Sequence, residues 1–239
     1  MTMSIEIYPV VHINERVQAL GQTALALEKG ADGVFLIDHF SPDESTLLKT
    51  YDEAADKFPL SFIGINMLRA QSSLEAFSTV IKAKNNGSIG RYPSGLWVDN
   101  AISKLHETHY FRIRSKLATI RYLGGVAFKY TPYYIDEPEV AAAEAAWTER
   151  YVDVVTTSGP ETGKPPNPDK IAAMKQALER KPLAVASGID AGNLEQYAEW
   201  VDQVLVASSI ETYSGSGVFD EAKLADLIEM AHELEKSDV

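Results

Sequence analysis

The 239-residue sequence contains no cysteine. It therefore offers no disulfide, no thiolate ligand for a metal and no cysteine nucleophile, and it fits a reducing compartment. Positive charge is also scarce, since 22 lysine and arginine residues face 34 aspartate and glutamate residues, for a net charge of −12. Nucleic-acid polymers and anionic membranes are bound through basic faces, so this balance argues against both as partners.

Long apolar runs are absent as well. No stretch approaches the roughly 20 apolar residues that a membrane-spanning helix needs. The opening residues, MTMSIEIYPVVHIN, lack the basic flank of a secretory signal. We therefore expect a cytoplasmic protein, and we predict one domain over residues 1–239 because the composition suggests no second one.

What the sequence does contain is a regular alternation of two kinds of segment. Short apolar runs, typical of parallel strands covered on both faces, alternate with segments whose apolar residues recur at helical spacing. The predicted strands are 5–13, 33–38, 61–68, 95–100, 123–130, 152–157, 183–188 and 203–208. The predicted helices are 15–30, 43–57, 72–86, 102–119, 137–150, 167–180, 193–200 and 220–235.

Eight such units favour a closed (β/α)8 barrel, the TIM barrel, over an open doubly wound sheet, which more often stops at five or six strands. In TIM barrels the functional site forms at the carboxyl ends of the strands. Each predicted strand here ends in polar residues. We therefore take the candidate site from these strand ends.

The last two predicted strands are followed by small residues, in ASGIDAGN and in VASSIE with GSGVFD. Small residues let backbone N–H groups approach an anion, and these two loops are the usual phosphate site of the fold. Each hydrogen bond to a charged group contributes roughly 1.5–3 kcal/mol, which outweighs distant repulsion screened over about 8 Å. Tight turns without a ligand are the alternative. The predicted phosphate-binding residues are Ser187, Gly188, Ile189, Ser208 and Ser209.

The segment VVTTSGPETGKPPNP, residues 154–168, leaves the sixth predicted strand. Its two glycines permit movement, and Pro165, Pro166 and Pro168 stiffen its end, where Asn167 caps the next helix with Pro168 at the first position. We predict a lid that closes over the substrate, with Lys164 reaching an anionic group. An ordinary mobile loop is the alternative.

Five strand-end residues have side chains suited to catalysis. Lys129 lies between two aromatic residues, where desolvation lowers the pKa of the amine, and it can serve as a base, an electrophile or a Schiff-base amine. Asp38 and Asp99 suit general acid and base work, and His12 and His39 titrate near neutrality. The structural alternatives are an ion pair for the lysine, a solvated strand end or helix cap for each aspartate, and a hydrogen-bonded core position for each histidine.

Further polar residues at the strand ends are suited to orienting a sugar hydroxyl or the edge of a base. The predicted substrate-binding residues are Asn66, Asn100, Thr156, Thr157, Ser158 and Lys164. The sequence has no H-x-H or H-E-x-x-H spacing, so we predict no metal site of the protein's own. Mg²⁺ carried by the phosphate of a substrate is the one cofactor that we consider.

Three stretches, SGPETGKPPNPDKI, PLAVASGIDAGNLEQYAEWVDQVLVASSI and GVFDEAKLADLIEMA, resemble the BtpA family of barrel proteins, named for a photosystem I biogenesis factor. The likeness extends to ALALEKGADGVFLID and GIN, and it is less specific over residues 80–150. It implies a barrel of the ribulose-phosphate-binding type.

A more distant resemblance is to phosphoribosylanthranilate isomerase, whose seventh and eighth strands have similar endings. That isomerase uses a cysteine after its first strand and an aspartate after its sixth. This sequence has His12 and the pair Thr156 and Thr157 at those places. With neither the acid nor the base present, we exclude that reaction.

Taken together, these features predict an enzyme of phosphorylated sugar or nucleotide metabolism that binds a small phosphorylated metabolite. Phosphoribosyl transfer or glycosidic cleavage ranks ahead of isomerisation, because two strand-end carboxylates can stabilise an oxocarbenium-like centre. The alternative is a non-catalytic binding or assembly factor that retains a phosphate site. A homodimer is left open.

Overall fold

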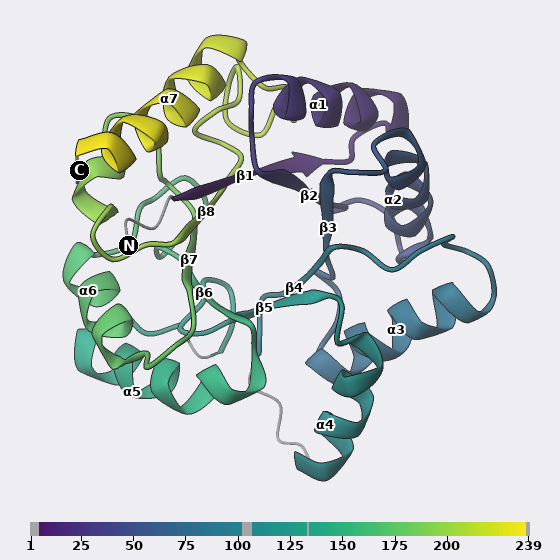
Figure 1. Ribbon diagram of the computed structural model, residues 1–239, viewed down its shortest axis with the longest axis horizontal. Coiled ribbons are helices and arrows are strands. Elements are labelled where there is room, and N and C mark those ends of the chain that lie inside the picture. Colours follow the sequence, from purple (N-terminus) through teal and green to yellow (C-terminus); the bar gives the residue numbers. More distant parts are fainter. Residues whose placement is uncertain (1–4, 102–106, 133, 238–239) are drawn as a thin grey trace.

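The computed structural model describes residues 5–101, 107–132 and 134–237. Eight parallel strands form a closed barrel in sequence order, each paired with the next, and the first also pairs with the eighth. Helices surround this ring of strands (Figure 1). The predicted (β/α)8 TIM barrel is confirmed.

Each strand overlaps one of the predicted apolar runs, and most strand residues are buried because the ring of helices covers their outer faces. The strands are β1 (Glu6–His12), β2 (Gly33–Ile37), β3 (Phe62–Asn66), β4 (Gly95–Val98), β5 (Arg121–Gly125), β6 (Val154–Thr157), β7 (Leu183–Ala186) and β8 (Gln203–Val206). The fifth strand differs most from its predicted range, 123–130. It ends at Gly125 because Ala127 and Tyr130 have positive φ angles of 48° and 59°, which do not continue a strand.

The α-helices are α1 (Arg16–Glu28), α2 (Ser45–Lys57), α3 (Ser73–Asn85), α4 (Glu107–Arg114), α5 (Pro138–Thr148), α6 (Pro168–Ala177) and α7 (Glu221–Ser237). In the described part of the chain there are also three short 3₁₀ helices, η1 (Ser115–Leu117), η2 (Glu149–Tyr151) and η3 (Leu194–Tyr197). Residues 102–106 of one predicted helix lie outside the described part of the chain. Among the described helices, none is both long and apolar enough to cross a membrane.

The predicted helix over 193–200 is wrong. That segment contains only the four-residue η3. The Tyr197 side chain is buried and its hydroxyl donates to the carbonyl of Pro166 at 2.8 Å, which fixes this short turn against the preceding loop. The chain must then reach β8 at Gln203, so no room remains for a longer helix.

The interior of the barrel is aromatic at mid-height. The Phe35 ring occupies the space that a side chain at Gly64 or Gly95 would need. Trp97 meets Phe35 edge to face at 6.0 Å and Phe128 at 5.9 Å between ring centroids. These rings fill the barrel interior below its carboxyl end, and Trp97 and Phe128 line the bottom of the cavity above them.

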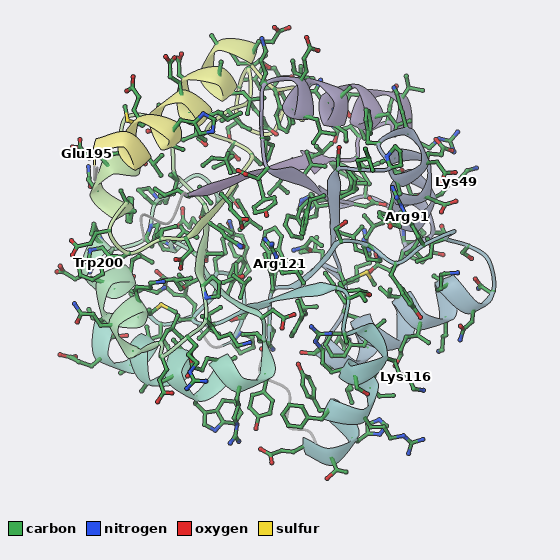
Figure 2. The ribbon with its side chains drawn as sticks, viewed as in Figure 1. Lys49, Arg91, Lys116, Arg121, Glu195 and Trp200 are labelled. Carbon is green, nitrogen blue, oxygen red and sulfur yellow. The ribbon has the colours of Figure 1, made fainter. Side chains whose placement is uncertain are left out.

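At the amino-terminal end, the barrel is closed by a polar cluster. Arg121 Nη1 donates to Glu6 Oε2 at 2.8 Å and to the Tyr8 hydroxyl at 2.7 Å, and Gln203 Nε2 donates to the same Glu6 oxygen at 2.6 Å. The guanidinium also lies 5.2 Å from the centroid of the Phe62 ring. Figure 2 shows Arg121 near the centre of the ring of strands.

Candidate functional site

A cavity of about 140 Å³ opens at the carboxyl ends of the strands, where the fold predicts the site. Several predicted catalytic and phosphate-binding residues meet here, although they come from separate loops. The predicted residues that line the cavity are His12, His39, Asp99, Lys129, Ser187, Gly188, Ser208 and Ser209.

Lys129 reaches the cavity from the loop after β5. Its Nζ lies 3.3 Å from Ser187 Oγ and 3.5 Å from the carbonyl oxygen of Ala186, and its backbone N–H donates to Ser158 Oγ at 2.8 Å. Burial lowers the pKa of the Lys129 amine, and the attraction of Asp99 opposes part of this shift. The amine therefore loses its proton more readily than a surface lysine does.

The backbone around Lys129 is strained. Ala127 and Tyr130 both have left-handed φ angles, which residues other than glycine rarely adopt. Such strain persists only where the surroundings enforce it, and it is common at functional sites. Here it turns the chain away from the sheet just before Lys129, so that the amine enters the cavity.

Asp99 follows β4 and lies beside Lys129 in the same cavity. Burial raises the pKa of the Asp99 carboxyl, while a hydrogen bond from Asn66 and the charge of Lys129 oppose that shift. The Asn66 Nδ2–Asp99 Oδ1 distance is 3.0 Å. Asn66 is buried and does not line the cavity, so in this structure it orients Asp99.

The two predicted histidines face each other, with ring centres 5.0 Å apart and ring planes at 76°. Burial is the main cause that lowers the pKa of both imidazoles. The Lys129 charge adds to the effect on His12, and His12 adds to the effect on His39. Burial thus favours the neutral form of both rings, in which one nitrogen of each ring can accept a proton.

A carboxylate that was not among the predicted site residues lies beside His12. Glu211 Oε1 is 3.5 Å from His12 Nδ1, and the Glu211 side chain is buried. The carboxylate accepts the backbone N–H groups of Gly215 at 2.6 Å and Gly217 at 3.2 Å. Its position after the eighth strand was the signal that could have identified it.

The loop after β7 requires a glycine at position 188. Gly188 has a φ of 65°, and an added Cβ would collide with the backbone of Lys164 and Pro165. Asn193 Nδ2 donates to the Gly188 carbonyl at 2.8 Å and holds the loop in place. Because Gly188 has no side chain, the backbone of Lys164 and Pro165 can pack directly against it, and Gly188 also lines the cavity.

The N–H groups of the two predicted phosphate loops are available. Within the described part of the chain, the backbone N–H groups of Gly188, Ser208 and Ser209 donate to no other protein atom. Ser209 Oγ donates to the Ile189 carbonyl at 2.6 Å and so joins the two loops. Ile189 itself is buried and does not line the cavity.

The segment after β6 covers part of the cavity. Thr162 and Gly163 line it. The Thr162 N–H donates to the Tyr130 hydroxyl at 3.1 Å, and Ser187 Oγ donates to the Glu161 carbonyl at 3.1 Å. The predicted lid therefore lies over the cavity, and its movement stays a prediction.

Lys164 lies outside the cavity. Its side chain is exposed and its Nζ is 2.9 Å from Glu161 Oε2. The predicted helix start at the end of this segment is confirmed, because Asn167 Oδ1 accepts the Asp169 N–H at 3.0 Å and Pro168 begins α6. The segment is thus fixed at its end and exposed along its middle.

Asp38 does not line the cavity. It is buried, and its Oδ1 accepts the N–H groups of Phe40 at 2.9 Å and Ser41 at 3.0 Å. Burial by itself raises the pKa of Asp38, but the bonds from Ser41 and Phe40 outweigh it, so the pKa is lower than usual. Asp38 shapes the turn that brings the next residue, His39, to the cavity.

The hydroxyls at the base of the lid and Asn100 also lie outside the cavity lining. Thr157 Oγ1 is 3.5 Å from the Ala127 carbonyl, and Ser158 Oγ accepts the N–H of the neighbouring Lys129. Thr156 is buried, and its Oγ1 has no hydrogen-bond partner among the described residues. Thr157 and Ser158 thus support the loop that presents the lysine.

A buried lysine that was not predicted lies behind this loop. Lys170 on α6 is 0% exposed, and its Nζ donates to the carbonyls of Ala127 and Ser158, both at 3.1 Å. It also lies 4.8 Å from the centre of the Tyr134 ring. Lys170 therefore ties together the two segments that frame Lys129.

Burial lowers the pKa of Lys170 to about 8. The sequence held a signal for this residue, because Lys170 precedes Ile171 and is four residues before Met174, both buried on the inner face of α6. A lysine beside such residues on a helix face is unusual.

The described residues include no group of three or more histidine, aspartate and glutamate side chains arranged to hold a metal ion.

Comparison with solved structures returns barrels of the same architecture. Phosphoribosylanthranilate isomerase from Thermus thermophilus aligns with a TM-score of 0.67 at 12% identity, covering 96% of this chain and 100% of that chain. The enzyme from Pyrococcus furiosus gives 0.66 at 16%, covering 96% and 99%. A structure described as native KDPGal gives 0.67 at 14%, covering 96% of each chain. These likenesses show the shared fold.

Sequence comparison gives a closer relationship. The Photosystem I biogenesis protein BtpA of Synechocystis sp. is 25% identical over 225 residues, which cover 91% of this chain and 76% of that protein. The model of the BtpA family matches residues 51–233, more than half of the chain and including the loops after β7 and β8. The chain therefore belongs to the BtpA family.

Proposed function

We propose that this protein is an enzyme that acts on a small phosphorylated sugar or nucleotide at the carboxyl end of the barrel. One observation carries the proposal: a single cavity contains Lys129, Asp99 and the loops whose N–H groups, at Gly188, Ser208 and Ser209, have no partner in the described chain. Such N–H groups suit a phosphate dianion. A desolvated lysine beside a carboxylate suits proton transfer and the stabilisation of charge.

The reaction that this arrangement favours is transfer or cleavage at the pentose carbon that bears the leaving group. The Lys129 ammonium, made more acidic by burial, donates a proton to the departing group. Asp99 stabilises the positive charge that develops on the sugar, and neutral His12 accepts a proton from the attacking nucleophile. Asp38 lies outside the cavity, so Asp99 takes this role alone. Mg²⁺ would enter on the substrate's phosphate.

Turnover assays test this proposal. The protein is incubated with phosphoribosyl pyrophosphate, ribose 5-phosphate and mononucleotides, with and without Mg²⁺, and release of base or pyrophosphate is followed. We expect turnover of at least one compound and a loss of about 10²–10⁴-fold in Lys129→Met. Lys164→Met is the matched control, since that lysine is exposed outside the cavity. Absence of both turnover and binding heat for every phosphate ester would contradict the proposal.

A second candidate is a binding or assembly factor that keeps the phosphate site without catalysis. The name of the Synechocystis relative, a photosystem I biogenesis protein, supports it. In that case a phosphate ester binds in calorimetry but is recovered unchanged, and no added metal or acceptor produces turnover. Turnover that depends on Lys129 would exclude this candidate.

A further inference from the structure

The Ser187 hydroxyl connects the Lys129 amine to the lid. Ser187 follows β7, lines the cavity and is 8% exposed. Its Oγ lies 3.3 Å from Lys129 Nζ, 3.1 Å from the carbonyl oxygen of Glu161 and 3.2 Å from the carbonyl oxygen of Lys164. Glu161 and Lys164 belong to the lid, so one hydroxyl contacts both the proposed acid of the site and the segment that covers it.

The direction of these hydrogen bonds follows from the protons that each group has. A hydroxyl has one proton to donate and two lone pairs that accept, whereas an ammonium group only donates. The two lid carbonyls only accept, so they share the single Ser187 proton, and Ser187 Oγ accepts from the Lys129 ammonium. A hydroxyl that accepts from a charged donor is itself a better donor, so the charged lysine strengthens the bond to the lid.

Loss of the Lys129 proton reverses this arrangement. A neutral amine has a lone pair, and the Ser187 hydroxyl lies within 3.3 Å of it. When the hydroxyl proton turns toward Nζ, the carbonyls of Glu161 and Lys164 lose it. Because the hydroxyl has only one proton, it does not hold the lid and donate to a neutral Lys129 at the same time.

The backbone of Ser187 is held in an unusual conformation. Its φ is 152°, which residues other than glycine rarely adopt, and such strain persists only where the surroundings enforce it. At the next residue, Gly188, the backbone of Lys164 and Pro165 packs so closely that an added Cβ would collide with it. The lid thus packs against the chain beside the Ser187 hydroxyl, and the placement of that hydroxyl depends on the closed lid.

Other titratable groups also face the Lys129 amine. In the described part of the chain, those that interact with its charge are Asp99, Tyr130, His12 and His39. On the lid, Glu161 Oε2 is paired with Lys164 Nζ at the exposed surface. Of all these groups, Lys129 is the one whose titrating atom hydrogen-bonds to Ser187 Oγ. Removal of the Ser187 hydroxyl therefore isolates the effect of Lys129 on the lid from the effects of the other groups.

From this geometry, and resting on the proposed function, we infer that Ser187 is a positioning residue that couples the charge of Lys129 to the closure of the lid. While the amine is charged, Ser187 holds the lid closed over the bound phosphate ester. When an N–H bond of the ammonium breaks and its proton passes to the departing group, the neutral amine takes the Ser187 hydrogen bond and the lid loosens. Product then leaves, and solvent returns a proton to Nζ.

Hydrogen exchange on the ligand-free protein tests the coupling. The N–H groups of Thr162 and Lys164 donate to the Tyr130 hydroxyl and to the Glu161 carbonyl in the closed lid, and they exchange when it opens. The closed lid binds the Lys129 proton more tightly than the open lid does, so closure is favoured below the pKa of Lys129 and weakened above it. We expect exchange, corrected for its intrinsic rate, to become about two- to tenfold faster across that pKa. An NMR titration of the lysine side-chain carbons locates the pKa.

Two variants and one control localise the effect. Ser187→Ala should make lid exchange about two- to tenfold faster below the Lys129 pKa and remove its change across that pKa. It should also lower the pKa of Lys129, because the ammonium loses an acceptor. Lys129→Met should likewise make lid exchange independent of pH. Ser209→Ala is the matched control, since the Ser209 hydroxyl donates to the Ile189 carbonyl, and it should leave the pH dependence of lid exchange as in the unaltered protein.

The outcomes separate this inference from the proposed function. If lid exchange does not change across the Lys129 pKa, or changes equally in Ser187→Ala, the coupling is wrong and the proposed reaction stands. If the coupling is observed and no phosphate ester is bound or turned over, the proposed function fails and the link between Lys129 and the lid stands. Should Ser187→Ala not fold, the unaltered protein and Lys129→Met decide, because equal pH dependence of lid exchange in the two would overturn the coupling.

Discussion

The two ends of the barrel use polar side chains in opposite ways. At the amino-terminal end, Arg121, Tyr8 and Gln203 all donate to partners within one cluster around Glu6. At the carboxyl end, Trp97 Nε1 and Asn66 Oδ1 have no hydrogen-bond partner in the described chain. At the amino-terminal end the donors pair within the cluster and stabilise the fold, although Gln203 Oε1 also has no partner among the described residues there. At the carboxyl end the backbone N–H groups of Gly188, Ser208 and Ser209 are the ones that a ligand in the cavity could use.

The charged side chains at the two ends of the barrel also differ. At the carboxyl end, burial lowers the pKa of Lys129 and raises the pKa of Asp99, so both are displaced toward their neutral forms. At the amino-terminal end, Arg121 and Glu6 form a direct ion pair at 2.8 Å. Perturbed groups in a cleft are typical of functional sites, whereas the paired charges are typical of structural ones.

The largest expected effect is a loss of turnover when Lys129, at the carboxyl end of the barrel, is replaced by an apolar side chain. Lys129→Met should lower turnover by about 10²–10⁴-fold. The same change should leave the free energy of unfolding the same or raise it by up to about 1 kcal/mol, because a buried amine is replaced by an apolar side chain of similar length. Assays and urea unfolding on one preparation measure both. A large loss of stability would mean that Lys129 is a structural residue.

Lys170→Met should lower the free energy of unfolding and loosen the two segments that position Lys129. It removes the hydrogen bonds that Lys170 donates to the carbonyls of Ala127 and Ser158, which costs about 1–3 kcal/mol. The pKa of Lys170 is about 8 in the folded protein and 10.5 in its ordinary state, so between these values the unfolded chain binds more protons and raising the pH stabilises the fold.

The difference in unfolding free energy between the unaltered protein and Lys170→Met should therefore grow as the pH rises from about 8 to 10.5. Urea unfolding of both proteins at several pH values measures it. A difference that stays constant over this range would show that Lys170 has an ordinary pKa. Lys175→Met is a poor control because Lys175 pairs with Asp202, so the exposed Lys164 is used instead.

At the amino-terminal end the expected effect is on stability alone. Arg121→Met removes the donor shared by Glu6 and Tyr8 and should lower the free energy of unfolding by about 1–2 kcal/mol, since the ion pair is partly exposed. Ligand affinity and turnover should not change. If turnover fell as much as in Lys129→Met, the proposed division between the two ends would be wrong.

The smallest effect is expected at the lid. Tyr130→Phe removes the hydroxyl that accepts the Thr162 N–H, a contact worth about 0.5–1.5 kcal/mol when closed. We expect faster ligand release, by a factor of about two to ten, with little change in stability because the contact is exposed. Stopped-flow displacement measures the rate. An unchanged rate would indicate that the segment does not move with the ligand.

Local patterns in the sequence were sufficient to predict the (β/α)8 architecture. Apolar runs and helical spacing depend on neighbouring residues only, and they located all eight strands. The cap at Asn167 and the glycine turn at Gly188 were predicted for the same reason. The helix predicted over 193–200 was wrong, because the bond from Tyr197 to Pro166 joins segments that are distant in the sequence.

The sequence by itself determined the barrel, the end at which the cavity lies and the residue types that surround it, because these follow from periodicity and strand order. Only the tertiary structure decided which side chains enter the cavity. Neighbouring residues at a strand end point to opposite sides, so His39 lines the cavity whereas Asp38 caps a turn. Lys170 acquires its position behind Lys129 through carbonyls that only folding brings within 3.1 Å of its amine.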